Sequence, residues 1–270
     1  MTFKIAVFLT CMLQMTMPGL FAQDTANSNI QKRNKMKIEI WSDIACPFCY
    51  IGKAHLAEAM KNLPDSDQIE IEWKSFQLDP TLPKSTDKTL FASLAESKGI
   101  TMEQATNMTV QVKGMAQKAG LVMDFDRVVP VNTFDAHRLL QFAKTQGKGD
   151  AVKLALLKAY FTEGADVADA ETLIGLGLKA GLPEKDLRET VNGDAFAKEV
   201  QSDIAEARQF NISGVPFFVV DRKYGISGAQ PAAQMEATLE KALTEWKVAN
   251  PKVALEMTEG AACKPDGACD

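Results

Sequence analysis

The sequence predicts an α/β fold in which a long run of helices interrupts the sheet. Residues 37–41 and 69–73 have strand character and flank a helical pattern over 47–62, which indicates a right-handed βαβ unit. The stretch 80–193 shows helical periodicity and no strand signal. Strand character then returns at 215–220. We therefore expect one sheet whose strands come from the two ends of the domain.

Residues 1–22 have the features of a secretory signal peptide. Lys4 supplies a positive charge, and the apolar run from Ile5 to Met17 is too short to span a membrane. An uncleaved anchor is the alternative, and the cleavage position stays open. Residues 23–35 are polar and lack periodicity, so we expect a disordered linker before the domain.

The first predicted strand leads into Cys46-Pro47-Phe48-Cys49, two cysteines at the start of a helical pattern. The unsatisfied N–H groups and positive dipole of a helix N-terminus favour a thiolate over a thiol. Pro47 is tolerated there because the first turn needs no N–H from it. We expect an exposed Cys46 to act as the nucleophile. Cys49, one turn later, is expected to resolve the mixed disulfide by forming a Cys46–Cys49 disulfide.

Two other interpretations of this cysteine pair are a zinc site and an inert structural disulfide. Structural zinc needs two further ligands, usually from a second close pair. The other cysteines after the leader, Cys263 and Cys269, are spaced too widely for such a pair, and the chain has only two histidines, His55 and His137. We therefore expect a redox pair, with no metal and no cofactor.

Capping signals divide the predicted helical stretch. Thr101 to Gln104 fits a capping box, with Gly120 ending that helix, and Asn132-Thr133 is expected to cap a helix that runs to about Gln146. Further helices are expected at 153–163, at 171–180, from Pro183 onward and at 195–210.

The second chemical signal is Gly214-Val215-Pro216, directly before a buried strand. A short return strand at 225–227 should pair antiparallel with it, and a helix follows at 231–246. A cis Val215–Pro216 bond would turn the backbone of Val215 toward the thiols, where an incoming peptide can pair with it. A trans proline that merely starts a strand is the alternative. With a cysteine pair after the first strand and a helical insert between, we expect the cis bond. We expect Val215 and Pro216, together with Pro47 and Phe48, to bind substrate.

This order of elements resembles the DsbA family of thioredoxin-fold oxidoreductases. The sequence from Ser42 to Lys53 is similar to sequences of the FrnE-like branch. Two further segments share this similarity: Asn132-Thr133 with Ala136-His137-Arg138, and the stretch from Ile212 to Phe218. The resemblance implies a thioredoxin-like fold with a helical domain inserted after the second strand, and it places His137 near the active site as a substrate-binding residue. The implied division is 36–79 and 194–249 for the thioredoxin domain, 80–193 for the helical insertion and 250–270 for a C-terminal tail.

The function implied by this resemblance is thiol–disulfide exchange with cysteine-containing protein substrates and a redox partner. With the leader, we expect a periplasmic or secreted protein that has no stable membrane span after signal removal. The net charge of −5 argues against a nucleic-acid partner. In the tail, a Pro-Asp-Gly turn signal between Cys263 and Cys269 predicts a second disulfide. This Cys263–Cys269 bond is either a static clasp or a shuttle that exchanges with the first pair.

Two other functions stay open. The glutathione-dependent isomerases and kappa-class transferases of this family have serine where this chain has Cys46, which argues against that branch. A holdase-like chaperone would use a flexible apolar groove lined by methionines. Met102, Met108, Met115 and Met123 are candidates for such a groove, but we expect them to pack the helical core instead.

Overall fold

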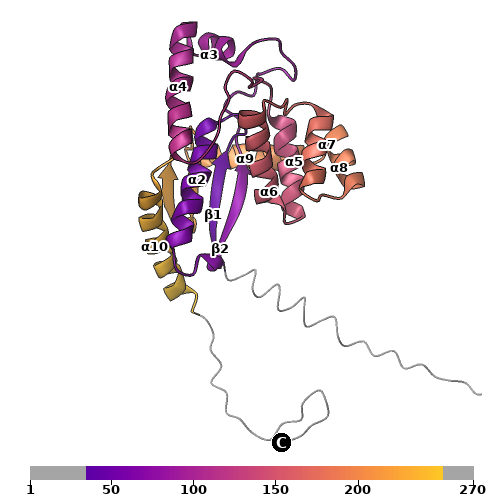
Figure 1. The fold of residues 1–270 in the computed structure, drawn as a ribbon. Helices are drawn as coiled ribbons and strands as arrows, with labels where there is room; N and C mark the ends of the chain where they lie inside the picture. The colour runs from indigo at the N-terminus through magenta and orange to yellow at the C-terminus, as the bar shows by residue number, and fades with distance from the viewer. Residues whose placement is uncertain (1–34, 252–270) are drawn as a thin grey trace, which may run out of the picture. The chain divides into compact units, whose positions relative to one another are not determined.

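The computed structural model describes residues 35–251, and its centre is a four-stranded sheet with the order β2-β1-β3-β4 (Figure 1). β1 (Met36–Ser42) and β2 (Ile69–Ser75) are parallel, with Met36 opposite Ile69 and Ser42 opposite Ser75. β3 (Phe217–Val220) is antiparallel both to β1 and to β4 (Tyr224–Ser227). The predicted α/β fold is confirmed, including the antiparallel final hairpin.

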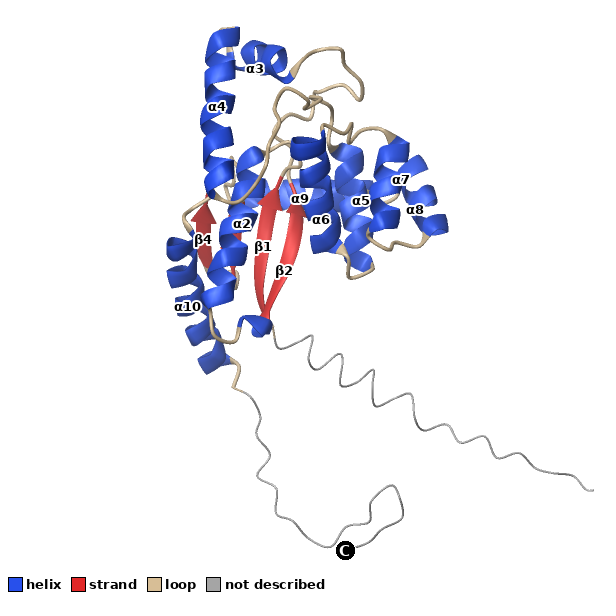
Figure 2. Cartoon of the chain, viewed as in Figure 1, coloured by secondary structure: helices blue, strands red, loops and turns tan. Residues whose placement is uncertain are grey.

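Both faces of the sheet are covered. On one face, β1 buries Ile38 and Ile40 against the helices α2 (Pro47–Asn62) and α10 (Ala232–Ala249), which lie side by side (Figure 2). On the other face, Trp41 packs with Ala207 of α9 (Ala197–Gln209), and its indole N–H donates to the carbonyl of Asp203 at 2.9 Å. A 3-10 turn at Ser66–Gln68 leads from α2 to β2.

In the sequence, the helical insertion follows β2 and precedes α9. The capping box at Thr101 is present, since its side chain accepts from the N–H of Gln104 and the Gln104 side chain accepts in return. One short helix, α3, was not predicted from the sequence. The insertion comprises α3 (Leu90–Lys98), α4 (Met102–Lys118), α5 (Phe134–Thr145), α6 (Gly149–Lys158) with a π-helical turn at Ala159–Glu163, α7 (Ala170–Lys179) and α8 (Glu184–Asn192).

Two sequence predictions about the insertion hold only in part. Of the expected capping pair Asn132-Thr133, Asn132 accepts from the N–H of Phe134 at 2.9 Å, whereas the Thr133 side chain makes no cap and its hydroxyl donates to another residue described below. The methionines do not all pack the core. Met123 is buried, whereas the three on α4 are about half exposed because they lie beside its buried stripe of Ala105, Thr109 and Ala116: Met102, Met108 and Met115.

Several predictions fall outside the described residues. These are the signal peptide at 1–22, the linker up to residue 34, and the tail beyond residue 251 with Cys263 and Cys269. Within residues 35–251, none of the helices combines the length and apolar character that crossing a bilayer requires.

Candidate active site

The two cysteines lie where the carboxyl end of β1 meets the first turn of α2. Cys46 is the N-cap residue of α2, Pro47 begins the helix, and Cys49 follows within the first turn. Both side chains are free thiols in this structure, so it holds the reduced pair. Cys46 is only 3% exposed, which corrects the expectation of an exposed sulfur. Phe48, by contrast, is 39% exposed.

The loop before β3 covers the first thiol. The Val215–Pro216 peptide bond is cis, as expected from the sequence. The S–H group of Cys46 donates to the carbonyl oxygen of Val215 at 3.3 Å, so this loop explains why the sulfur is buried. Val215 is itself half-buried, and Gly214 before it is exposed. The structure therefore brings Cys46 and the Val215-Pro216 segment together across the sheet end.

Gly52 allows α2 to approach this loop closely. A Cβ atom at this position would lie 3.0 Å from the Pro216 ring and 3.2 Å from the Phe218 ring. Both distances are tighter than ordinary van der Waals contact, so a larger residue would push the helix away from the proline loop. Gly52 was not among the site residues predicted from the sequence, although it lies within the motif that resembles the FrnE-like branch.

Asp43, three residues before Cys46, is a fully buried carboxylate with a complete set of donors. It accepts hydrogen bonds from the Leu78 N–H at 2.7 Å, the Thr133 hydroxyl at 2.8 Å and the Ala45 N–H at 3.4 Å. Burial alone would raise its pKa, but the hydrogen bond from His137 and these donors outweigh burial, and the pKa of Asp43 is lowered. A permanent negative charge therefore lies beneath the thiols.

His137 of α5 is completely buried behind this carboxylate rather than at the surface. Its Nε2 lies 3.3 Å from Oδ1 of Asp43, and its Nδ1 has no hydrogen-bond partner. Burial lowers the pKa of His137 against the opposing effect of Asp43, which favours the neutral ring with Nε2–H donating to the carboxylate. In this position the ring orients Asp43. Its assignment as a substrate-binding residue stays a prediction.

Lys153 of α6 is a second charged group that is completely buried at this site. Its ammonium group donates to the carbonyl of Ser42 at 3.3 Å and lies 5.4 Å from the ring centroid of Trp73. Burial lowers its pKa to about 8, although the negative charges of Cys49 and Asp43 act in the opposite direction. Lys153 was not among the site residues predicted from the sequence. A lysine next to the apolar positions Val152 and Leu156 in a predicted helix was the available signal.

The two thiols interact directly, and their pKa values shift in opposite directions in the reduced pair. A hydrogen bond with Cys49, burial and the charges of Cys49 and Asp43 raise the pKa of Cys46. Burial opposes ionisation of Cys49 too, but the hydrogen bond from Cys46 and the positive charge of Lys153 outweigh it, and its pKa is lowered. Buried charges therefore act on both thiols in addition to the helix N-terminus, and the assignment of Cys46 as the nucleophile stays a prediction.

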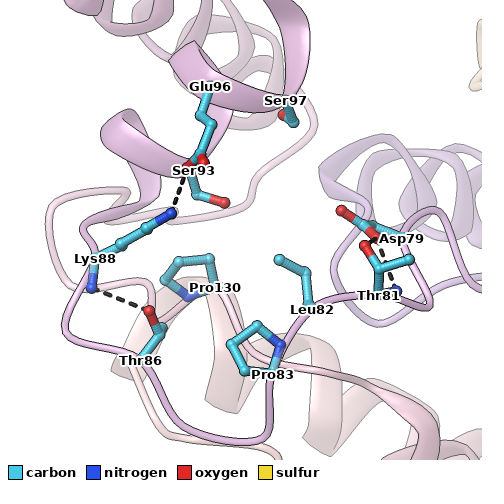
Figure 3. Close-up of a pocket in the computed structure, with 10 residues that line it drawn as sticks. All are labelled: Asp79, Thr81, Leu82, Pro83, Thr86, Lys88, Ser93, Glu96, Ser97 and Pro130. Atoms are coloured by element: carbon cyan, nitrogen blue, oxygen red, sulfur yellow. Dashed lines mark hydrogen bonds and ion pairs between the residues drawn. The ribbon is translucent and has the colours of Figure 1, made fainter.

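A separate hollow of about 320 Å³ lies away from the thiols, between α3 and the loop that follows β2 (Figure 3). The ammonium of Lys88 donates to the carboxylate of Glu96 at the rim of this hollow, and the hydroxyl of Thr81 donates to the carboxylate of Asp79. Neither cysteine lines this hollow. Among residues 35–251, no cluster of three or more His, Cys, Asp or Glu side chains is arranged to hold a metal ion.

Comparison with known proteins gives matches over most of the chain. A family model described as the DSBA-like thioredoxin domain matches residues 37–240. A probable DsbA oxidoreductase from Streptomyces coelicolor is 37% identical, with a TM-score of 0.73, and the match covers 87% of this chain and 98% of that one. The Bacillus subtilis protein YwbO is 25% identical over 210 residues, which is 77% of this chain and 96% of the relative.

A more distant solved structure shares the fold. The cytosolic disulfide reductase DsbM from Pseudomonas aeruginosa is 18% identical, with a TM-score of 0.52, and the match covers 77% of this chain and 99% of that one. At this level of identity the likeness concerns the fold alone.

Proposed function

Because the chain belongs to the family of DSBA-like thioredoxin domains, we propose that it is an exported thiol–disulfide oxidoreductase of the FrnE-like branch. It exchanges disulfides with cysteine-containing proteins through Cys46 and Cys49. The family is one of thiol–disulfide oxidoreductases; the export, the branch and the protein substrates are the parts that this proposal adds. The periplasm or the medium is the proposed location, on the basis of the leader-like residues 1–22.

One observation supports the proposal most strongly. Two reduced thiols lie at the first turn of α2, and the Cys46 S–H group is 3.3 Å from the backbone carbonyl of Val215 in the cis-proline loop. An extended peptide that pairs with this loop would bring its own sulfur to Cys46. The exposed ring of Phe48 and the half-exposed side chain of Leu78 border the same site, since the Leu78 N–H bonds Asp43. These groups offer an apolar rim for a peptide.

Cys46 is the proposed nucleophile, because its sulfur is the one that faces the Val215 loop. As a thiolate, Cys46 attacks one sulfur of a substrate disulfide, the substrate S–S bond breaks, and the other substrate sulfur leaves as a thiolate. Cys49 then attacks Cys46, which releases the substrate and leaves the Cys46–Cys49 disulfide. The reverse sequence oxidises a substrate dithiol.

Mixed-disulfide trapping tests these roles. In a Cys49→Ala variant, substrate should accumulate on Cys46, identified by non-reducing electrophoresis and mass spectrometry. A Cys46→Ala variant should trap none. Accumulation only in Cys46→Ala would reverse the roles, and accumulation in neither would contradict the proposed exchange. Mass measurement of the mature N-terminus tests export, since an intact Met1 in the purified cellular protein would contradict signal cleavage.

A holdase-like chaperone is the second candidate, favoured by the three exposed methionines of α4. Insulin turbidity separates the two candidates. An oxidoreductase accelerates aggregation of the insulin chains in the presence of dithiothreitol, and it needs Cys46 to do so. A holdase suppresses aggregation in both the parent protein and Cys46→Ala. Conjugation of glutathione to an electrophile, followed in parallel, would instead favour the glutathione-dependent branch.

A further inference from the structure

Lys153 makes no ion pair with a carboxylate, among residues 35–251, although its side chain is completely buried. Its described contacts are the Ser42 carbonyl and the face of Trp73. A backbone carbonyl offers only part of the compensation that a buried ammonium requires, since an unpaired buried charge is costly. The neighbours of Lys153 on α6 that share its burial are apolar, among them Val152, Leu156 and Leu157.

An apolar residue of similar length would pack this position without the cost of burying a charge. Replacing buried charges by well-packed apolar side chains is often neutral or stabilising. Packing therefore does not explain a lysine here. The lysine is explained if a negative charge forms beside it at some stage of the protein's working cycle.

The position of the Lys153 ammonium points to that charge. It donates to the carbonyl of Ser42, the last residue of β1, directly before the segment that carries Cys46 and Cys49. In agreement with this position, the negative charges of Cys49, Asp43 and Cys46 act to raise the pKa of Lys153. Asp43 already has its own donors from Leu78 and Thr133. The other titratable groups near these charges are His137 of α5, whose pKa burial lowers, and Tyr160, whose pKa burial raises.

We propose that Lys153, supplied by α6 of the helical insertion, is a positioning residue that stabilises the anion of Cys49 each time the mixed disulfide on Cys46 is resolved. The proposal rests on the proposed function and adds a role for a residue outside the cysteine motif. Lys153 then acts beside Thr133 and His137, the other residues by which the helical insertion contacts this site.

Cys49 loses its S–H proton to water, and its thiolate attacks Sγ of Cys46. The bond between Cys46 and the substrate sulfur breaks, the Cys46–Cys49 bond forms, and the substrate sulfur leaves with the electron pair and takes a proton from water. The pair is oxidised by two electrons and the substrate disulfide is reduced. Lys153 keeps its proton throughout and acts only through its charge.

The direct test titrates Cys49 without any substrate. In full-length Cys46→Ala protein, the rate of iodoacetamide alkylation at Cys49 is followed against pH by peptide mass spectrometry. Adding Lys153→Met should raise the pKa of Cys49 by about one to three units, the effect of removing an opposite charge a few ångströms away. An unchanged pKa in folded protein would overturn the proposal.

Lys53→Met is the matched control. Lys53 is also nearly buried, but its ammonium forms an ion pair with Asp150 at 3.1 Å. Asp150 in turn accepts a hydrogen bond from the indole N–H of Trp73, so Lys53 lies near the same ring. This control should leave the pKa of Cys49 unchanged, and an equal shift in both variants would also overturn the proposal. If Lys153→Met does not fold, Lys153→Gln replaces it. Since the titration needs no disulfide exchange, it can fail while substrate trapping succeeds, or the reverse.

Discussion

Two lysines of this protein have lost most of their contact with water, and their surroundings are opposite in kind. Lys74 on β2, with a side chain 12% exposed, has four carboxylates within reach of its ammonium. Lys153 on α6 is completely buried and faces a carbonyl, a ring and the thiols. The partners of Lys74 are Glu206 at 3.2 Å, Asp203 at 3.3 Å, Glu72 at 3.4 Å and Glu39 at 3.7 Å.

The pKa values of the two lysines move in opposite directions. Burial would lower the pKa of Lys74, but Asp203 and the other carboxylates outweigh burial and raise it. Burial prevails at Lys153, whose pKa falls to about 8. The difference teaches that a buried lysine surrounded by carboxylates joins elements of the fold, here β1, β2 and α9. A buried lysine that lacks them, beside groups that change charge during a reaction, is a candidate for a functional role.

The largest expected effect is a difference in unfolding free energy between variants of the two lysines. Lys74→Met leaves several carboxylates without their cation, and breaking such a buried network typically costs about 3–5 kcal/mol of unfolding free energy. Lys153→Met should not lower the unfolding free energy at neutral pH, because an apolar side chain fits that site without the cost of burying a charge. Urea unfolding of the reduced proteins measures both. Equal losses of unfolding free energy in the two variants would contradict the difference proposed between the two lysines.

A second prediction adds a cation from the exposed side of the thiols. Phe48 cannot donate a hydrogen bond or carry charge, so the protein should be a weaker oxidant than relatives with histidine at that position. Phe48→His should stabilise the thiolate and raise the reduction potential of the pair by about 30 mV, equivalent to about 1.4 kcal/mol. Equilibration with glutathione buffers measures this change. An unchanged or lower potential would contradict the electrostatic account.

A third prediction removes the negative charge that lies beneath the thiols. The charge of Asp43 contributes to the raised pKa of Cys46. Asp43→Asn should therefore lower the pKa of Cys46 by about one unit, opposite in sign to the effect of Lys153→Met on Cys49. Alkylation against pH in a Cys49→Ala background measures it, with Asp150→Asn as a control in an exposed carboxylate. A rise in the pKa after Asp43→Asn would refute the assignment.

The smallest expected effect is a pH dependence of stability. The folded-state pKa of Lys153 is about 8 and its ordinary value is 10.5. Between these values the unfolded chain binds more protons than the folded one, so the contribution of Lys153 to stability rises with pH across this window. The slope is less than about 1.4 kcal/mol per pH unit. Unfolding of the parent protein should show this rise relative to Lys153→Met, and parallel curves would exclude it.

The parts of the fold that were predictable depend on local signals. α2 runs from Pro47 to Asn62 as predicted, because a proline at its first position and apolar spacing mark it. The cis bond at Pro216 was predictable only in combination with the cysteine pair and the strand that follows. Both features lie in segments whose amino-acid sequence resembles the FrnE-like branch.

The features that were missed depend on contacts between distant parts of the chain. The Lys153–Ser42 hydrogen bond joins residues 111 positions apart, and helical periodicity does not say which buried face meets the thiols. The pair Asn132-Thr133 was expected to cap α5, but only Asn132 bonds the start of the helix, and the Thr133 hydroxyl donates to Asp43, 90 positions earlier. Cys46 was expected to be exposed because nothing local indicates that the Val215 loop covers it.

The reduction potential of the Cys46–Cys49 pair tests the central claim most directly. The full-length protein is equilibrated in glutathione buffers, and the fraction of the Cys46–Cys49 disulfide is determined by peptide mass spectrometry. The account predicts a reversible two-electron titration, a more negative potential in Lys153→Met because the reduced pair loses its cation, and an unchanged potential in Lys53→Met. A pair that forms no reversible disulfide, or equal potentials in the parent protein and Lys153→Met, would contradict it.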